Sequence, residues 1–212
     1  MDSCPCCVDD THKQQLSAAP LRELTEEQLD TYTWKAMTTW GEVDDFKHFL
    51  PRIFELTAMS DFTADLTVFS KLKYAEWDKW AAEEKETVVS FLVALWHYNT
   101  ISKVYFNKEL FVEAVNRSNN INLLLSNWVV STDNTSIRNF VNFVYYHLND
   151  LAQPANLFKL ITPEDRKQTI SWATKQLPVL ENAFFHFEKN DPEFAQEISN
   201  ALYILEHNTI NI

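Results

Sequence analysis

Glycine is almost missing from this sequence. Gly41 is the single glycine among 212 residues, where average usage predicts about 15. Glycine supplies the positive-φ positions of hairpin turns and phosphate-binding loops. Its near-absence excludes G-x-G-x-x-G, G-x-x-x-x-G-K-[ST] and G-x-S-x-G motifs, and with them the usual forms of dinucleotide-binding, P-loop and nucleophile-elbow chemistry. It also argues against a fold rich in β-sheet.

Long apolar runs and secretory features are lacking as well. The longest apolar run, residues 91–96, is six residues long, far short of a membrane span. The first residues, MDSCPCCVDDTHKQQ, have neither a basic region nor an apolar core, so they do not resemble a secretory signal. Three cysteines within four positions do not form a disulfide framework. We therefore expect a cytoplasmic protein that has no membrane partner.

Positive charge is scarce and unevenly distributed. Acidic residues outnumber basic ones 30 to 18, which gives a net charge of -12. Residues 1–98 contain 18 acids and 9 bases, and residues 99–212 contain 12 and 9. This excess opposes binding to nucleic acid and to anionic lipid surfaces. The acidic first half favours a basic or metal-bearing partner, the alternative being ordinary solvated helix faces.

Helical periodicity dominates what is present. Apolar residues recur at i, i+3, i+4 and i+7 from Leu29 to Trp40, Thr25 and Gln28 form a capping box, and Gly41 suits a left-handed C-cap. A second helix is expected to begin at Asp44 and to kink or break at Pro51. Residues 83–101 are apolar on nearly every face, which predicts a central helix.

The remaining pattern predicts further helices and no convincing strand. The expected ranges are 61–74, 107–116, 121–130, a helix after the loop 131–136, one from Thr162–Pro163 to Pro178, and one after Asp191–Pro192. Roughly nine or ten helices make an all-α fold. Residues 1–23 are expected to form a flexible, cysteine-rich tail, and residues 24–212 a single helical domain.

A faint repeat suggests how these helices stack. Histidines near expected helix ends, at positions 48, 97, 147 and 186, are 49, 50 and 39 residues apart. HEAT and armadillo units are about 40–47 residues long. The spacing predicts an irregular stack of antiparallel helix pairs, a HEAT-like α-solenoid or α-α superhelix. The alternative is a compact helical bundle whose histidines favour the helix dipole.

The most unusual local string is Cys4-Pro5-Cys6-Cys7, which His12 follows five residues later. Thiolates and imidazole are ligands of zinc and copper(I). Adjacent cysteines on one short segment are unlike structural zinc sites, whereas copper(I) tolerates such crowding. Asp9 and Asp10 are expected to raise the pKa of these thiols. The alternative is a tail whose cysteines have no metal or thiol function.

A second candidate site lies at Asp44, Asp45 and His48. Their i, i+4 and i, i+3 spacing places carboxylates and an imidazole on one helix face, as in one half of a helical di-iron site. Three residues before each of His97, His147, His186 and His207 stands an apolar residue instead of a carboxylate. Acids in the first turn also favour the helix dipole without any further role. Helical catalysis through these residues is the weaker hypothesis.

The stretch LTEEQLDTYTWKAMTTWGEVDDFKHFLPRIFEL, residues 24–56, together with the cysteine-rich leader, resembles uncharacterised bacterial all-helical proteins. The resemblance implies a bacterial, cytosolic source and no particular activity. From the residues themselves, the leading hypothesis is a non-enzymatic protein-interaction module with an acidic helical surface and no cofactor. The alternative is a metal- or thiol-handling protein that uses Cys4, Cys6, Cys7 and His12.

Overall fold

The computed structural model describes residues 1–59 and 65–208, and within them the chain is all-helical, with no strand. Contacts divide it into two compact units, Met1–Val88 and Val89–Ile212. The division falls inside α5 (Ala82–Ser102). No helix of the described residues is long and apolar enough to cross a membrane.

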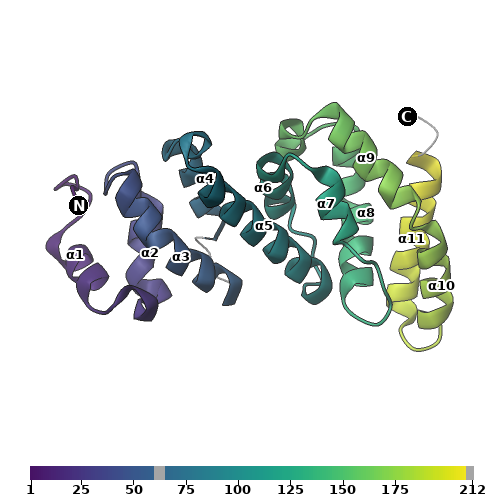
Figure 1. Ribbon diagram of the computed structural model, residues 1–212. Helices are drawn as coiled ribbons and strands as arrows, with labels where there is room; N and C mark the ends of the chain where they lie inside the picture. The colour runs from purple at the N-terminus through teal and green to yellow at the C-terminus, as the bar shows by residue number, and fades with distance from the viewer. Residues whose placement is uncertain (60–64, 209–212) are drawn as a thin grey trace. The chain divides into compact units, whose positions relative to one another are not determined.

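Helices α1 to α4 and the short 3-10 helices η1 and η2 lie in the described part of the first unit (Figure 1). They are α1 (Asp10–Ser17), η1 (Leu21–Glu23), α2 (Glu26–Lys35), α3 (Val43–Met59), α4 (Asp65–Tyr74) and η2 (Trp77–Lys79). The start of the helix expected over 61–74 lies outside the described residues. The core is aromatic: Tyr32 contacts Trp40 and Phe49, and Phe46 contacts Trp80.

Helix α1 occupies part of the segment for which the sequence predicts a flexible tail. Its N-cap, Asp9, accepts a hydrogen bond from the His12 amide, and the His12 ring accepts one from the Asp9 amide. This is a capping box, in which an N-cap and an N3 side chain satisfy two free amides. Val8 and Leu16 are buried on either side of the cap.

The corner at Gly41 differs from the expected one. The capping box of Thr25 and Gln28 is confirmed, but α2 ends at Lys35, before the apolar pattern does. The following turn ends at Gly41, whose φ is +73°. The Gly41 amide donates to the Asp2 carbonyl at 2.8 Å, so the glycine pairs with the start of the chain instead of capping α2.

Helix α3 also differs from expectation. It begins at Val43 and continues through Pro51 to Met59 without breaking. The Asp45 carboxylate accepts a hydrogen bond at 3.0 Å from the amide of Glu42, the residue just before the helix. Asp44 also lies in the first turn. His48 lies in the second turn, and the histidine-ended repeat is therefore not seen in α3.

The second unit contains α6 (Lys108–Ser118), α7 (Ile121–Ser126), α8 (Ser136–Ala152), η3 (Asn156–Leu160), α9 (Pro163–Thr174), α10 (Leu177–Phe187) and α11 (Pro192–Asn208). Helices α10 and α11 lie side by side (Figure 1). The starts at Thr162 and Asp191 are confirmed by their side-chain caps. The helix that begins after Thr162 ends at Thr174, before Pro178, which lies in the first turn of α10.

Helix α5 buries one stripe, although its sequence is apolar on nearly every face. Val88, Leu92, Trp96 and Thr100 are buried at successive i, i+4 positions, while the residues between them are half-buried or exposed. In the second unit, Trp96 contacts Phe106, Phe111 and Trp128. These rings form the centre of that unit's core.

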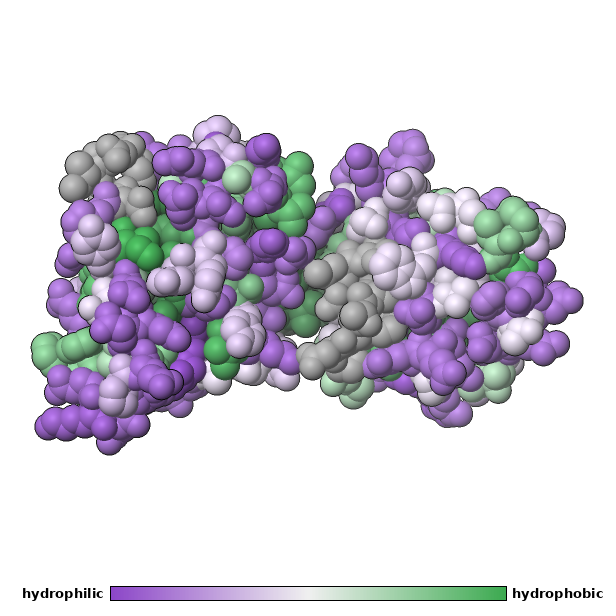
Figure 2. Space-filling view, turned by 180° about the vertical axis from the view of Figure 1, so that it is seen from behind, coloured by the Kyte–Doolittle hydropathy of each residue, from purple (hydrophilic) through white to green (hydrophobic). Residues whose placement is uncertain are grey.

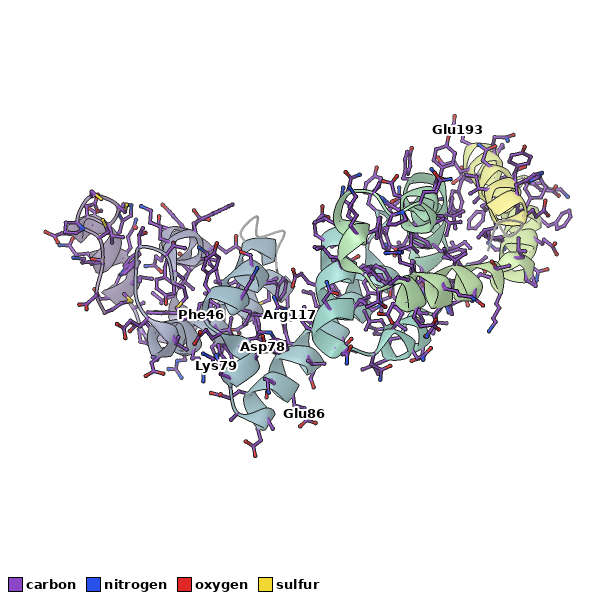
Figure 3. All side chains as sticks on the ribbon, turned by 90° about the horizontal axis from the view of Figure 1, so that it is seen from above. Phe46, Asp78, Lys79, Glu86, Arg117 and Glu193 are labelled. Atoms are coloured by element: carbon purple, nitrogen blue, oxygen red, sulfur yellow. The ribbon has the colours of Figure 1, made fainter. Side chains whose placement is uncertain are left out.

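The surfaces of both units are largely polar. Figure 2 shows hydrophilic side chains over much of each unit, with smaller hydrophobic areas between them. Phe46 is fully buried, whereas Glu86 and Glu193 extend from the helices (Figure 3). This separation is typical of amphipathic helices packed around a core.

Candidate functional site

The three cysteines come together in the structure. Their Sγ atoms all lie within 4.8 Å of one another, with 2.7 Å between Cys4 and Cys6 and 3.6 Å between Cys6 and Cys7. Among the residues that the structure describes, this is the one group of three or more His, Cys, Asp or Glu side chains close enough to share a metal ion. Cys6 is exposed, and the other two are half-buried.

Backbone bonds explain why these sulfurs converge. The amides of Cys7 and Val8 both donate to the Cys4 carbonyl at 3.0 Å, which closes a single turn over residues 4–8. The Cys4 amide donates to the Thr39 carbonyl at 2.9 Å. The Lys35 ammonium donates to the Cys7 carbonyl. The turn is thus attached at one end to the segment after α2 and at the other to Lys35, the last residue of α2.

Contacts among the thiols change their acidity. Hydrogen bonding from the neighbouring sulfurs lowers the pKa of Cys4, and the same contacts raise the pKa of Cys6 to about 11. The sequence predicts a different cause, repulsion from Asp9 and Asp10. In the structure, the contacts with neighbouring cysteines are the main cause of the shifts at Cys4 and Cys6, and Asp9 and Asp10 do not contribute.

His12 is not part of the cysteine group. Its Nδ1 atom lies 3.3 Å from the Asp9 amide and 2.9 Å from the Asp9 carboxylate. The pKa of the Asp9 carboxyl is lowered mainly by the His12 backbone amide, which donates to it at 2.9 Å. The predicted fourth ligand therefore serves as a capping residue of α1.

The structure does not bring the residues of the second predicted site together. Asp45 is engaged by the Glu42 amide, and the exposed His48 ring packs edge-on against Phe49 at 4.9 Å. Asp44, Asp45 and His48 belong to no group of three potential ligands among the described residues. First-turn capping accounts for the position of Asp45.

A groove in the second unit is a further candidate site that sequence reasoning missed. Its volume is about 410 Å³, and its walls come from the segment before α6, from α8 and from α11. The lining residues are Val104, Tyr105, Arg138, Val141, Asn142, Tyr145, Tyr146, Phe194, Glu197 and Asn200. Tyr105, Tyr145 and Tyr146 are all exposed.

Hydrogen bonds fix the walls of this groove. Asn139 donates to the carbonyls of Lys103 and Tyr105 at 3.0 Å, and Asn142 accepts from the Phe106 amide at 3.0 Å. These bonds hold the segment before α6 against α8. The signal in the sequence was Tyr145–Tyr146, which fall outside the buried stripe of α8.

Arg138 is fixed at the floor of the groove. Its guanidinium lies 3.9 Å from the centre of the Phe194 ring and 2.5 Å from the Asp191 carboxylate. Hydrogen bonding from Arg138 lowers the pKa of Asp191. The groove therefore combines rigid aromatic rings with an oriented guanidinium, a composition enriched at protein interfaces.

Comparisons with known proteins give no relative against which the two candidate sites could be interpreted. No family model, no curated protein and no solved structure matches the chain. The two candidate sites, the cysteine turn and the tyrosine-lined groove, are accordingly interpreted from their own chemistry.

Proposed function

We propose that this protein is a non-enzymatic module that binds another protein through the tyrosine-lined groove of its second unit. The observation that carries the proposal is the set of three exposed tyrosines around a groove whose walls are held by Asn139 and Asn142. Tyrosine and arginine are frequent hot-spot residues, and tyrosine buries a large area at small entropic cost.

The charge of the chain supports a basic partner. The 18 acids and 9 bases counted for residues 1–98 all lie in the first unit, which ends at Val88, since residues 89–98 include no charged residue. Glu197 lies in the groove together with Arg138, whose charge is paired with Asp191. A negative field speeds the approach of a basic protein.

The same proposal includes a HEAT-like arrangement within the second unit. Helices α10 and α11 are joined by four residues, a length typical of antiparallel neighbours. Contacts then run from α11 to α8, from α8 to α9 and from α9 to α7. The three free cysteines support a reducing, cytoplasmic setting.

Affinity capture from the native extract at moderate salt tests the groove. The double variant Tyr105→Ala/Tyr146→Ala should lose a stoichiometric partner that the unmodified chain retains. Each hot-spot truncation costs about 2 kcal/mol or more, which is roughly a 30-fold loss of affinity. Tyr203→Ala is the matched control, because Tyr203 and Tyr146 are both 63% exposed and Tyr203 does not line the groove.

Two outcomes would contradict the proposal. One is a bare monomer on size exclusion with no stoichiometric partner at any salt concentration. The other is equal retention of a partner by the double variant and by the Tyr203→Ala control, which would place the binding surface elsewhere. Circular dichroism of both variants separates lost binding from lost folding.

A further inference from the structure

The cysteine turn has the donor atoms and the spacing of a soft-metal site. A trigonal or tetrahedral ion with metal–sulfur bonds of about 2.3 Å places its sulfurs about 3.8–4.0 Å apart. The observed sulfur separations of 2.7 and 3.6 Å, and the upper limit of 4.8 Å for the group, span that value. Rotations about the cysteine side-chain bonds change these separations without movement of the backbone.

The number of available donors favours copper(I) over zinc. Zinc sites in proteins almost always have four ligands, and the nearest predicted fourth ligand, His12, is used in the capping box of α1. Copper(I) is a soft ion that thiolates select, and it is satisfied by three of them. The cluster supplies three sulfurs and no nitrogen.

The turn is attached firmly enough to present these sulfurs together. Ser3 forms an antiparallel bridge with Trp40, and the Gly41 amide bonds the Asp2 carbonyl. Val8, at the other end of the turn, is buried. Three thiolates and one copper(I) ion sum to a charge of -2, and the Lys35 ammonium at the Cys7 carbonyl partly offsets it.

We propose that Cys4, Cys6 and Cys7 bind one copper(I) ion in a three-coordinate, all-sulfur site. Binding forms three copper–sulfur bonds and releases the three thiol protons to solvent, with no change in oxidation state. This site belongs to the first unit and does not depend on the groove of the second unit. Its success or failure is therefore independent of the proposed protein-binding function.

Competition against a chelator tests the site in the full-length chain. The reduced protein is titrated with copper(I) under anaerobic conditions in the presence of bathocuproine disulfonate. We expect one copper(I) per chain. Loss of a supporting residue near a metal costs about 10–100-fold in affinity, so Cys4→Ser, Cys6→Ser or Cys7→Ser should each lower the affinity by about 100-fold or more.

His12→Gln is the matched control for this titration. Glutamine at N3 preserves the capping box while it removes the imidazole, so the copper affinity should be unchanged. X-ray absorption of the loaded chain should show sulfur neighbours only. Copper loading should also protect all three cysteines of the unmodified chain from alkylation, a measurement that needs no variant.

Several results would overturn the inference. Equal copper retention by the unmodified chain and a Cys4→Ser/Cys6→Ser/Cys7→Ser variant would show that the three cysteines do not bind the copper. A nitrogen neighbour in the absorption spectrum, or a loss in His12→Gln as large as in a cysteine variant, would replace it with a mixed-donor site. Zinc that displaces copper(I) stoichiometrically would reject the assignment of the metal.

Discussion

Gly41 is the residue at which backbone conformation is most restrictive. Its φ of +73° lies in the left-handed region, and an added Cβ would lie 3.1 Å from both Cβ and Oδ2 of Asp45. The left-handed conformation alone costs about 1–2 kcal/mol for a residue with a side chain. We expect Gly41→Ala to lower the free energy of unfolding by at least about 1 kcal/mol in a denaturant titration.

Asn119→Gly provides the opposite test of the same principle. Asn119 has a φ of +48° as the C-cap of α6, where glycine is the residue most often found. Replacement of Asn119 by glycine should leave the free energy of unfolding unchanged or raise it slightly.

A Gly41→Ala protein as stable as the unmodified chain would contradict the first prediction. It would show that the corner at Gly41 relaxes to another conformation.

His147 predicts a pH dependence of stability. It is half-buried beside Phe106 and Phe158. Burial is the main cause that lowers its pKa; Lys108 adds to this, while Asp150 and Glu109 oppose it. In the unfolded chain its pKa is about 6.5. As the pH falls through 6.5, His147 takes up a proton in the unfolded chain before it does so in the folded chain. The free energy of unfolding therefore falls as the pH falls.

Thermal unfolding between pH 7.5 and pH 5.5 measures this effect. His147→Phe keeps a planar ring among aromatic neighbours and removes the ionisation, so its melting temperature should fall less on acidification than that of the unmodified chain. Equal slopes for the two proteins would show that His147 does not contribute to the pH dependence.

Among the elements, α3 contains a proline at an unfavourable place. Pro51 lies in the ninth position of a 17-residue helix, where a proline removes one hydrogen bond and typically costs about 3 kcal/mol or more. We expect Pro51→Ala to raise the unfolding free energy. Pro163→Ala is the control and should not raise the unfolding free energy. Pro163 occupies the first turn of α9, where the missing N–H would have no helical hydrogen-bond partner. A destabilised Pro51→Ala protein would mean that the helix is adapted to the proline.

Local signals predicted the elements well where caps and periodicity agreed. Thr25 with Gln28, and Thr162 with Pro163, mark helix starts that the structure confirms. Helix α1 was missed because its capping box uses aspartate and histidine, Asp9 and His12, instead of the common residue pair. Helix α2 ends early because a turn with positive φ at Met37 interrupts a periodicity that continues to Trp40.

The candidate sites differ in how far the sequence revealed them. The cysteines are neighbours in the chain, so their adjacency alone indicated a cluster, although only the fold shows that His12 is used elsewhere. The groove joins Tyr105, Tyr146 and Phe194 from three segments. No local pattern encodes such a meeting, because it depends on tertiary contacts between α8 and α11.

At the scale of the whole molecule, electrostatics follows from how the basic residues are used. Lys47, Arg52, Lys79, Arg117 and Arg138 each lie within 3.2 Å of a carboxylate oxygen. The acids exceed the bases by 12, so carboxylates remain after such pairing. We expect no retardation of duplex DNA and no flotation with anionic vesicles, but binding of polylysine that weakens as salt is raised.

First-turn acids separate the contributions of the two units to this binding. Glu27→Gln/Asp44→Asn removes two exposed charges from α2 and α3 of the first unit, and Glu164→Gln/Glu193→Gln removes two from α9 and α11 of the second. Both pairs change the net charge and the helix dipoles equally. Since the first unit carries an excess of nine acids, its variant should lose more polylysine affinity in a fluorescence titration. Equal losses would show that polylysine senses only the net charge of the chain, and binding that is insensitive to salt would contradict the electrostatic account.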